Sequence, residues 1–487
     1  MAKKPNVLFI LTDDQGAWAM HCAGNPDIYT PNLDRIAASG MRFDNFFCAS
    51  PVCSPARASL LTGKIPSGHG VLDWIRSGNV DGAKFAAQGK ENPYADGYDQ
   101  ERLPIAYLED QVGYTDVLAE HGYHCALSGK WHLGDSVRPQ HGFEKWYTLG
   151  LGGCCYYHPD IVENGTIEVK HGTYVTELFA QKALEYLDEL SGGDRPFYLA
   201  VHFTAPHSPW EKEHHPKKWI DYYEDCRFES VPDVPDHPDL LTGPVYGTEK
   251  RRENLRGYYA AVSAMDEQVG RILDALEAKG LREDTVVVFT ADNGMSMGQH
   301  GIWGKGNATF PMNMYDSAVK VPFLISWPGR IPQGRVCSHM VSAYDWFPTL
   351  LELLDIDNPH GAELPGKSFL CSLEGNGAKQ EGEVVIFDEY GPVRMIRNRE
   401  WKYIHRYPYG PHELYHLTED PEEQNNRYGQ PEYEEKSLEL KRKLEQWFLR
   451  YVNPEIDGTR EGVTGSGQLC RPGIYACRTD VYPPVGT

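Results

Sequence analysis

The chain has 487 residues, of which 41% are hydrophobic, and a formal net charge of −22 at pH 7. This length can bury a large core, in more than one domain or in one large α/β domain with an appendage. The acidic balance argues against nucleic acid or an anionic membrane as the main partner, and no apolar run approaches the roughly 20 residues of a transmembrane helix.

The start of the chain and its cysteines bear on the cellular compartment. The apolar run at residues 6–12 leads directly into acidic residues and has no signal-peptide cleavage site. The 11 cysteines are an odd number scattered through a large chain, which is typical of reduced thiols. We therefore expect a cytoplasmic protein for the sequence as given, or a periplasmic or secreted one if a leader peptide has been removed.

The first elements in chain order predict strands that alternate with helices. The continuous apolar run at residues 6–11 predicts a strand buried on both faces. Thr30 and Pro31 favour the start of a helix that stops at Gly40. Further elements are expected as helices at 111–121 and 174–190 and as strands at 123–127 and 196–203.

A short motif at residues 53–57, Cys-Ser-Pro-Ala-Arg, lies where a loop changes into a helix that stops at Gly63. Cys53 then lies at the helix N-terminus, where free N–H groups favour an anion. Arg57 follows about one turn later and can reach the same point. Taken alone, a small buried side chain explains this cysteine better than an activated thiolate does.

Acidic and amide side chains follow two of the expected strands. Asp13 and Asp14 come directly after the first strand, and Asp292 and Asn293 follow a strand expected at residues 285–290. Sites in open α/β sheets form beyond the carboxyl ends of strands, and adjacent carboxylates repel each other unless a cation lies between them. An acidic turn explains either pair alone, but together the four oxygen donors suit a hard divalent ion.

Cationic and histidine side chains lie beyond the same strand ends. Lys130 and His132 share one face of an extended segment, His207 lies in a proline-rich loop, and Lys305 follows the last of these strands. A surface lysine and a structural histidine would explain them singly. Together they supply the donors that a sulfate or phosphate transition state requires.

Residues 67–108 are rich in Gly, Asn, Asp and Tyr, show no clear periodicity and predict a long functional loop region. Trp74 and Arg76 lie in it, and an aromatic ring beside an arginine suits stacking on a sugar and holding an anion. An ordinary surface loop is an equally good interpretation. His300 is a third candidate for substrate binding.

The second half predicts the rest of an α/β fold: a large doubly wound sheet, mixed but mostly parallel, flanked by helices. The expected elements are helices at 255–281 and 344–354 and strands at 285–290 and 320–327. A smaller C-terminal α+β domain is expected, with antiparallel strands at 384–387, 393–397 and 401–405, a helix at 432–451 and an irregular tail from about Pro454. We expect a catalytic domain at residues 1–372 and the smaller C-terminal domain at residues 373–487.

The pattern C-x-P-x-R followed by A-S-L-L-T-G, and the run G-K-W-H-L-G at residues 129–134, resemble the signatures of type I sulfatases in the alkaline phosphatase superfamily. The resemblance covers residues 6–329 in strong motifs and continues weakly beyond. It implies an alkaline phosphatase-like fold and hydrolysis of a sulfate ester, which we expect to be a carbohydrate sulfate. It also implies that a formylglycine-generating enzyme converts Cys53 into formylglycine, whose hydrate is the nucleophile.

The resemblance further implies a role for each matching residue. One hydroxyl of the hydrated aldehyde attacks sulfur, and His132 helps the other to expel sulfate. The modified Cys53 binds Ca²⁺ or Mg²⁺ together with four further ligands: Asp13, Asp14, Asp292 and Asn293. The remaining cations hold the charge of the nucleophile (Arg57 and Lys130) or bind sulfate oxygens and support the leaving group (His207 and Lys305).

Two other functions stay open. A phosphodiesterase or phosphonate monoester hydrolase shares this fold and can share formylglycine, but such enzymes usually have Asp-His-Gly where residues 292–294 are Asp-Asn-Gly. A non-catalytic protein that binds sulfated glycans through an unmodified Cys53 is less favoured, because every catalytic motif is intact. Residues 307–316 depart from the family's tyrosine-glutamate-glycine stretch, so the resemblance does not extend to substrate contacts there.

Overall fold

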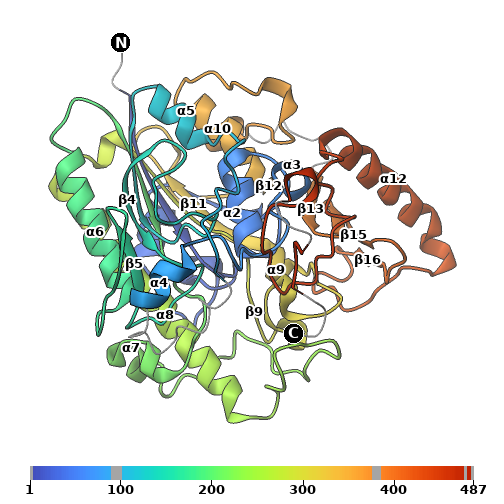
Figure 1. Cartoon of the computed structure of the whole chain (residues 1–487). Helices are drawn as coiled ribbons and strands as arrows, with labels where there is room; N and C mark the ends of the chain where they lie inside the picture. The colour runs from blue at the N-terminus through green and yellow to red at the C-terminus, as the bar shows by residue number, and fades with distance from the viewer. Residues whose placement is uncertain (1–3, 89–100, 376–384, 477–479, 484–487) are drawn as a thin grey trace.

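The computed structural model describes residues 4–88, 101–375, 385–476 and 480–483 (Figure 1). Residues 89–100 of the expected loop region and Val384 of the expected strand lie outside the described residues. In the part of the chain that is described, every cysteine is a free thiol, and no helix has both the length and the apolar character needed to cross a bilayer.

A ten-stranded sheet forms the centre of the molecule, in the order β12-β2-β11-β8-β1-β7-β3-β4-β5-β6. The run from β8 through β1, β7 and β3 to β4 is parallel, whereas β11 and the β5–β6 edge pair antiparallel with their neighbours. The expected mixed, mostly parallel sheet is therefore confirmed. The strands are β1 (Asn6–Thr12), β2 (Met41–Phe47), β3 (His124–Gly129), β4 (Phe143–Leu149), β5 (Asp160–Glu163), β6 (Thr166–Val169), β7 (Phe197–His202), β8 (Thr285–Ala291), β11 (Lys320–Ser326) and β12 (Arg335–Ser342).

The central strands are buried on both faces because helices cover each side of the sheet. All seven residues of β1 are buried. Phe9 packs into one hydrophobic cluster with side chains of α2 (Cys53–Thr62), α5 (Tyr114–Glu120) and α10 (Trp346–Leu353). Its neighbour Leu8 packs into a second cluster with side chains of α1 (Pro31–Ala38), α6 (Val175–Leu190) and α8 (Glu249–Ala278). Successive side chains of a strand point to opposite faces, so this alternation places one core on each side. Figure 1 shows α2, α5, α6, α8 and α10 around the sheet.

The expected helices are present, with shifted ends. The helix expected at 255–281 begins earlier, at Glu249, and the first turns of the expected loop region form two short helices, α3 and α4. The helices are α1 (Pro31–Ala38), α2 (Cys53–Thr62), α3 (Pro66–His69), α4 (Gly82–Gln88), α5 (Tyr114–Glu120), α6 (Val175–Leu190), α7 (Lys217–Tyr222), α8 (Glu249–Ala278), α9 (Asp316–Val319), α10 (Trp346–Leu353), α11 (Leu370–Leu373) and α12 (Glu434–Tyr451).

A four-stranded antiparallel sheet and α12 form the C-terminal part, as expected, and lie beside the large sheet in Figure 1. The strands are β13 (Ile386–Tyr390), β14 (Val393–Arg397), β15 (Trp401–Arg406) and β16 (Glu413–His416). The buried ammonium of Lys402 on β15 lies 3.0 Å from Asp316 of α9 and 2.5 Å from Glu423. This buried ion cluster joins the two parts; the domain boundary at 372 stays a prediction.

Candidate active site

The helix α2 begins at Cys53 and places this side chain at the centre of the site. All ten residues of α2 are buried, and Gly63 ends the helix in the left-handed region with a φ of 69°. Cys53 is only 3% exposed, and burial together with the nearby Asp13 carboxylate raises the pKa of its thiol. The unmodified cysteine is therefore a protonated thiol and not an activated thiolate.

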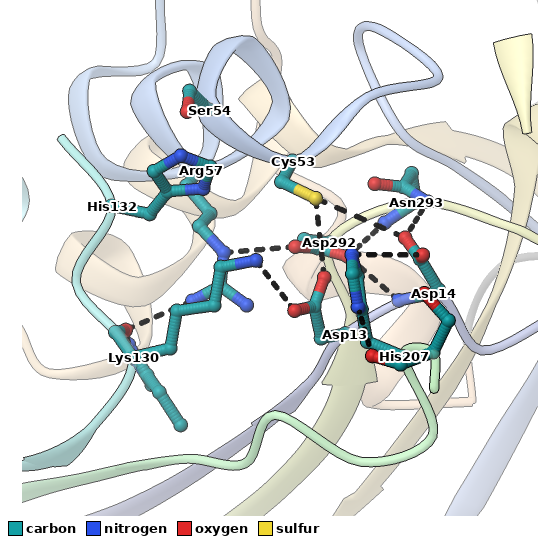
Figure 2. Close-up of polar contacts among 12 residues, drawn as sticks. Asp13, Asp14, Cys53, Ser54, Arg57, Lys130, His132, His207, Asp292 and Asn293 are labelled. Atoms are coloured by element: carbon teal, nitrogen blue, oxygen red, sulfur yellow. Dashed lines mark hydrogen bonds and ion pairs between the residues drawn. The ribbon is translucent and has the colours of Figure 1, made fainter. Parts of the chain in front are cut away.

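The carboxyl ends of β1 and β8 bring the predicted metal ligands together beneath Cys53 (Figure 2). The two strands are adjacent and parallel, with Thr12 opposite Ala291, so the residues that follow them lie at the same height. Asp14 Oδ1 accepts a hydrogen bond of 2.8 Å from the amide of Asn293, and the Asp14 N–H donates to Asp292 Oδ1 over 3.2 Å. Asp14 has a φ of 61°, a strained conformation of the kind found at functional sites.

The residues present fit a hard divalent cation. Ligand atoms of Asp13, Asp14, Cys53 and His207 all lie within 4.8 Å of one another. Oδ1 of Asn293 is buried and has no hydrogen-bond partner, which leaves an oxygen free for a ligand. Asp292 is not one of these four residues. Its Oδ1 accepts hydrogen bonds from the backbone N–H groups of Asn293 and Asp14, and its Oδ2 accepts one from the guanidinium of Arg57. Several carboxylate and amide oxygens around one point form a donor set that suits Ca²⁺ or Mg²⁺.

Burial and crowding perturb the carboxylates of this cluster. Burial and the neighbouring Asp13 carboxylate raise the pKa of Asp292 to about 7. Burial also disfavours the charged form of Asp13, but Lys130 and His207 outweigh it and hold the pKa of Asp13 well below its usual value. Clustered buried carboxylates of this kind require nearby cations.

Three buried cations offset the three buried carboxylates. Lys130 Nζ lies 2.5 Å from Asp13 Oδ2, and Arg57 Nε lies 2.8 Å from Asp292 Oδ2. Lys305 forms an ion pair with Asp14 and also donates to Cys53 Sγ over 2.8 Å. The positive charge that an anionic substrate needs is thus concentrated at one point of a strongly acidic protein. Arg57 Nη2 is buried without a hydrogen-bond partner and remains available as a donor.

Two histidines face the cluster in different ways. His132 has a φ of 57°, and its Nε2 lies 2.9 Å from the carbonyl of Ile75. A carbonyl accepts only, so Nε2 carries the proton, and Nδ1 is buried with no partner. Burial and the Lys130 ammonium lower the pKa of His132, which is therefore neutral with a free lone pair. His207 Nδ1 lies 2.8 Å from the Ser208 carbonyl, and its Nε2 lies 3.6 Å from Asp14 Oδ2.

The cluster opens into a pocket of about 1210 Å³. Trp74 and Arg76 line this pocket, as do His132, His207 and Lys305, so the structure brings all these predicted residues to one cavity. It does not bring His300 there. That side chain stacks on Tyr315 with ring centroids 3.8 Å apart and lines a separate cavity.

Comparison with known proteins identifies the family. The profile of the sulfatase family matches residues 5–356, and the profile for the N-sulphoglucosamine sulphohydrolase C-terminal region matches residues 298–449. The chain belongs to the sulfatase family. Its activity is therefore that of a sulfuric ester hydrolase, and the resemblance found in the sequence is confirmed.

Named sulfatases match most of the chain. An ulvan-active sulfatase of Formosa agariphila is 31% identical over 458 residues, which cover 91% of this chain and 80% of that protein. An N-acetylglucosamine-6-O-sulfatase of Bacteroides thetaiotaomicron is 28% identical, with 93% and 88% covered. A structure of a protein in complex with its substrate D-glucosamine-2-N,6-O-disulfate superposes with a TM-score of 0.74 at 25% identity and covers 94% of this chain and all of that one.

Sequence reasoning missed several residues that line or support this sulfatase's pocket. Ser54 Oγ accepts a hydrogen bond of 3.0 Å from the Ile75 amide and so ties the Trp74 loop to α2. Asn307 and Ser466 line the pocket, and Ser466 comes from the segment that we expected to be an irregular tail. The repeated glycines at 465 and 467 were the signal available in the sequence, since glycine marks close approach of the backbone.

Proposed function

We propose that this sulfatase hydrolyses a carbohydrate sulfate ester with a formylglycine made from Cys53 and a divalent cation, Ca²⁺ or Mg²⁺. The observation that carries the proposal is the position of Cys53. Its Sγ lies 3.2 Å from Asp13 Oδ1 and 2.8 Å from Lys305 Nζ, at the floor of the pocket. A nucleophile at this atom would lie between the carboxylates that suit a metal and a cation that suits sulfate.

The groups that the proposal adds have defined chemical roles. A formylglycine hydrate supplies one hydroxyl that attacks sulfur and a second whose deprotonation expels sulfate and restores the aldehyde. A divalent cation held by Asp13, Asp14, Asp292, Asn293 and residue 53 would polarise a sulfate oxygen and favour ionisation of the hydrate. A formylglycine-generating enzyme is required to oxidise the cysteine.

The chain's own side chains provide the proton transfers and charge stabilisation. Neutral His132 presents an unprotonated Nδ1, which can accept the proton from the second hydroxyl. Arg57 and Lys130 hold negative charge near the nucleophile, because both are buried beside it. His207 Nδ1 donates to the Ser208 carbonyl, so Nε2 donates to the leaving oxygen only when the imidazole carries both protons, and Lys305 binds a sulfate oxygen.

The carbohydrate assignment is supported by the pocket and by the relatives. An indole and a guanidinium at the pocket wall suit a sugar ring and its polar substituents. The relatives described above are named for sugar sulfates. Asn293 also stands where phosphonate monoester hydrolases usually have histidine, which favours a sulfate over a phosphate ester.

Two measurements test the proposal. The mass of the peptide that contains Cys53 should show the loss of one sulfur and two hydrogen atoms and the gain of one oxygen that convert a thiol into an aldehyde. Sulfate release should then be measured on a panel of monosulfated sugars, with a phosphate diester as the comparison. Turnover of the diester above every sugar sulfate, or full activity with an unmodified thiol, would contradict the proposal.

A further inference from the structure

We propose that the turn at residues 465–468, called here the 465–468 turn, is part of the substrate site and positions Trp74 and Arg76 against the sugar. The inference rests on the proposed function, since it assigns the contacts of the sugar that carries the sulfate. The turn comes from the segment beyond α12, about 390 residues from the loop that it contacts.

The turn binds both the backbone and the side chains of that loop. The Gln468 N–H donates to the Trp74 carbonyl over 2.7 Å, and the Arg76 N–H donates to the Gln468 carbonyl over 2.9 Å, which forms a parallel β-bridge at Ile75. The indole Nε1 of Trp74 donates to the Gly465 carbonyl over 3.0 Å, and Arg76 Nη1 donates to the Ser466 carbonyl over 3.2 Å. Both pocket side chains are therefore oriented by carbonyls of the turn.

Gly467 permits this close approach. Its φ of 103° lies in the region that favours glycine. A Cβ atom at this position would lie 2.7 Å from Cβ of Arg76 and 2.9 Å from Cζ2 of Trp74. Both distances are shorter than real Cβ contacts, so any larger residue must displace the indole or the backbone.

Two buried polar side chains lock the turn in place. Asp73 is fully buried and accepts hydrogen bonds from the Gly467 N–H at 2.9 Å and the Tyr390 hydroxyl at 2.6 Å. The Gln468 amide is also fully buried; it accepts from the Leu72 N–H at 2.9 Å and donates to two carbonyls. Buried groups that are fully paired specify one geometry. Because Tyr390 lies on β13, the C-terminal sheet takes part in fixing the pocket wall.

The turn also contacts a second loop that lines the pocket. Asn307 Nδ2 donates to the Gly465 carbonyl over 3.3 Å, and a Cβ atom on Gly465 would lie 2.9 Å from Cβ of Asn307. Asn307 follows Lys305 by two residues, and both line the pocket together with exposed Ser466. The turn therefore spans from the Trp74 loop to the Lys305 loop, where this chain departs from the family's usual sequence.

This arrangement predicts a division between sugar binding and sulfate binding. In the proposed function Cys53, Lys305 and the metal ligands hold the sulfate group, whereas the 465–468 turn contacts the Trp74 loop and Asn307. Because the Ile75 carbonyl of that loop also binds His132, a disturbed turn lowers kcat as well, and it is KM and the sulfate inhibition constant that separate sugar binding from sulfate binding. A disturbed turn should weaken the binding of the sugar and leave the binding of sulfate ion unchanged. A general loss of structure would weaken both.

Gly467→Ala is the test variant, and Gly462→Ala is its matched control. Gly462 lies in the same segment, has no positive φ, and would place a Cβ atom in open space. The wild-type enzyme is first assayed on a panel of monosulfated sugars, and the best substrate is then used for all variants. Gly467→Ala should raise KM for this sugar sulfate about tenfold or more, while the inhibition constant of inorganic sulfate changes less than about twofold. Gly462→Ala should change neither.

Tyr390→Phe is a second variant, which removes only the hydroxyl donated to Asp73. It should raise the same KM about three- to tenfold, again without an effect on sulfate inhibition, and thermal unfolding should be measured alongside. Equal changes in sugar KM and sulfate inhibition, or no change in either constant for Gly467→Ala and Tyr390→Phe, would overturn the inference alone. A wild-type enzyme that hydrolyses aryl sulfates but no sugar sulfate would overturn the carbohydrate assignment and the inference together.

Discussion

Lys305 Nζ lies 2.8 Å from Sγ of Cys53 while the same ammonium group forms an ion pair with Asp14. One cation therefore contacts both the nucleophile position and the carboxylate cluster. Burial disfavours the charged lysine, but Asp14 outweighs it and raises the pKa of Lys305. Lys305 is thus held as a cation beside residue 53, from which the proposed function has the sulfate group attacked.

Cys53→Ser should abolish multiple turnover of sulfate esters, by at least about 1,000-fold, without loss of folding. Serine is nearly isosteric with cysteine but does not become the aldehyde in most maturation systems. Activity, thermal unfolding and the mass of the peptide check this expectation. Cys371→Ser is the matched control, because Cys371 is an exposed free thiol and should tolerate the change. Sustained turnover by a Cys53→Ser enzyme with an intact hydroxyl would rule out formylglycine catalysis.

Chelation should inactivate the enzyme and lower its melting temperature, and Ca²⁺ or Mg²⁺ should restore both. The reason is that a bound cation stabilises only the folded state, in which Asp13 and Asp14 converge. Asp14→Ala should lose activity without rescue by added metal, whereas Asp274→Ala, at a largely exposed carboxylate, should behave as wild type. If chelators changed neither the activity nor the melting temperature, the cluster would hold no metal.

His207→Ala tests whether this histidine protonates the leaving group. A sugar hydroxyl is a poor leaving group, so the hydrolysis of a sugar sulfate should fall by about 10²- to 10⁴-fold. Activated aryl sulfates have leaving groups that need no proton, so their hydrolysis should fall much less. The measurement is kcat/KM on aryl sulfates of graded leaving-group pKa. Equal losses across the series would mean that His207 only binds sulfate or orders its loop, and Lys305 would be the next candidate.

Lys402→Met should destabilise the protein by about 3–5 kcal/mol, because it leaves the buried carboxylate of Glu423 without its cation, whereas Asp316 keeps its ion pair with Arg397. Denaturant unfolding measures this loss of free energy. Lys436→Met is the control, since Lys436 pairs with Glu439 near the surface of α12 and such pairs contribute little. Equal effects of the two substitutions would mean that the cluster does not hold the C-terminal sheet against α9.

Asp266 should make stability depend on pH. It accepts hydrogen bonds from the Asn32 and Leu33 amides at the start of α1, and burial raises its pKa from 3.8 to about 7. The folded protein thus keeps the proton to higher pH than the unfolded chain does, so this group's stability is present below about pH 4 and is lost as pH rises to 7. The melting temperature of the wild type should therefore fall relative to that of Asp266→Asn as the pH rises from about 4 to 7. Asp274→Asn, on the exposed side of α8, should show no such trend.

The central fold could be predicted because its signals are local. Strand β1 is a continuous apolar run buried on both faces, and its pattern is unambiguous. Strand β2 was missed because partly exposed polar residues such as Arg42 and Asp44 interrupt its apolar side chains. The hairpin of β5 and β6 lies at the edge of the sheet, where burial is incomplete and the periodicity is weak.

The site residues that could be predicted are likewise those with a local signal in the sequence. The carboxylates and cations around Cys53 follow strands within a few residues, and parallel strands bring such ends together. His300 was a candidate for substrate binding, but the backbone at Gly301 packs against the Pro235 carbonyl and His300 stacks on Tyr315 instead. The contacts of Gly465 with Trp74 span about 390 residues, and no local pattern can specify them.

The 465–468 turn also sets the order in which the enzyme can become active during its synthesis. Gln468 follows Cys53 by 415 residues, which corresponds to roughly 20 to 80 s of translation at ~5–20 residues per second. Cys53 emerges from the ribosome during that interval, while the last wall of the pocket does not yet exist. Modification of the cysteine therefore precedes completion of the pocket whenever the maturation enzyme acts on the emerging chain.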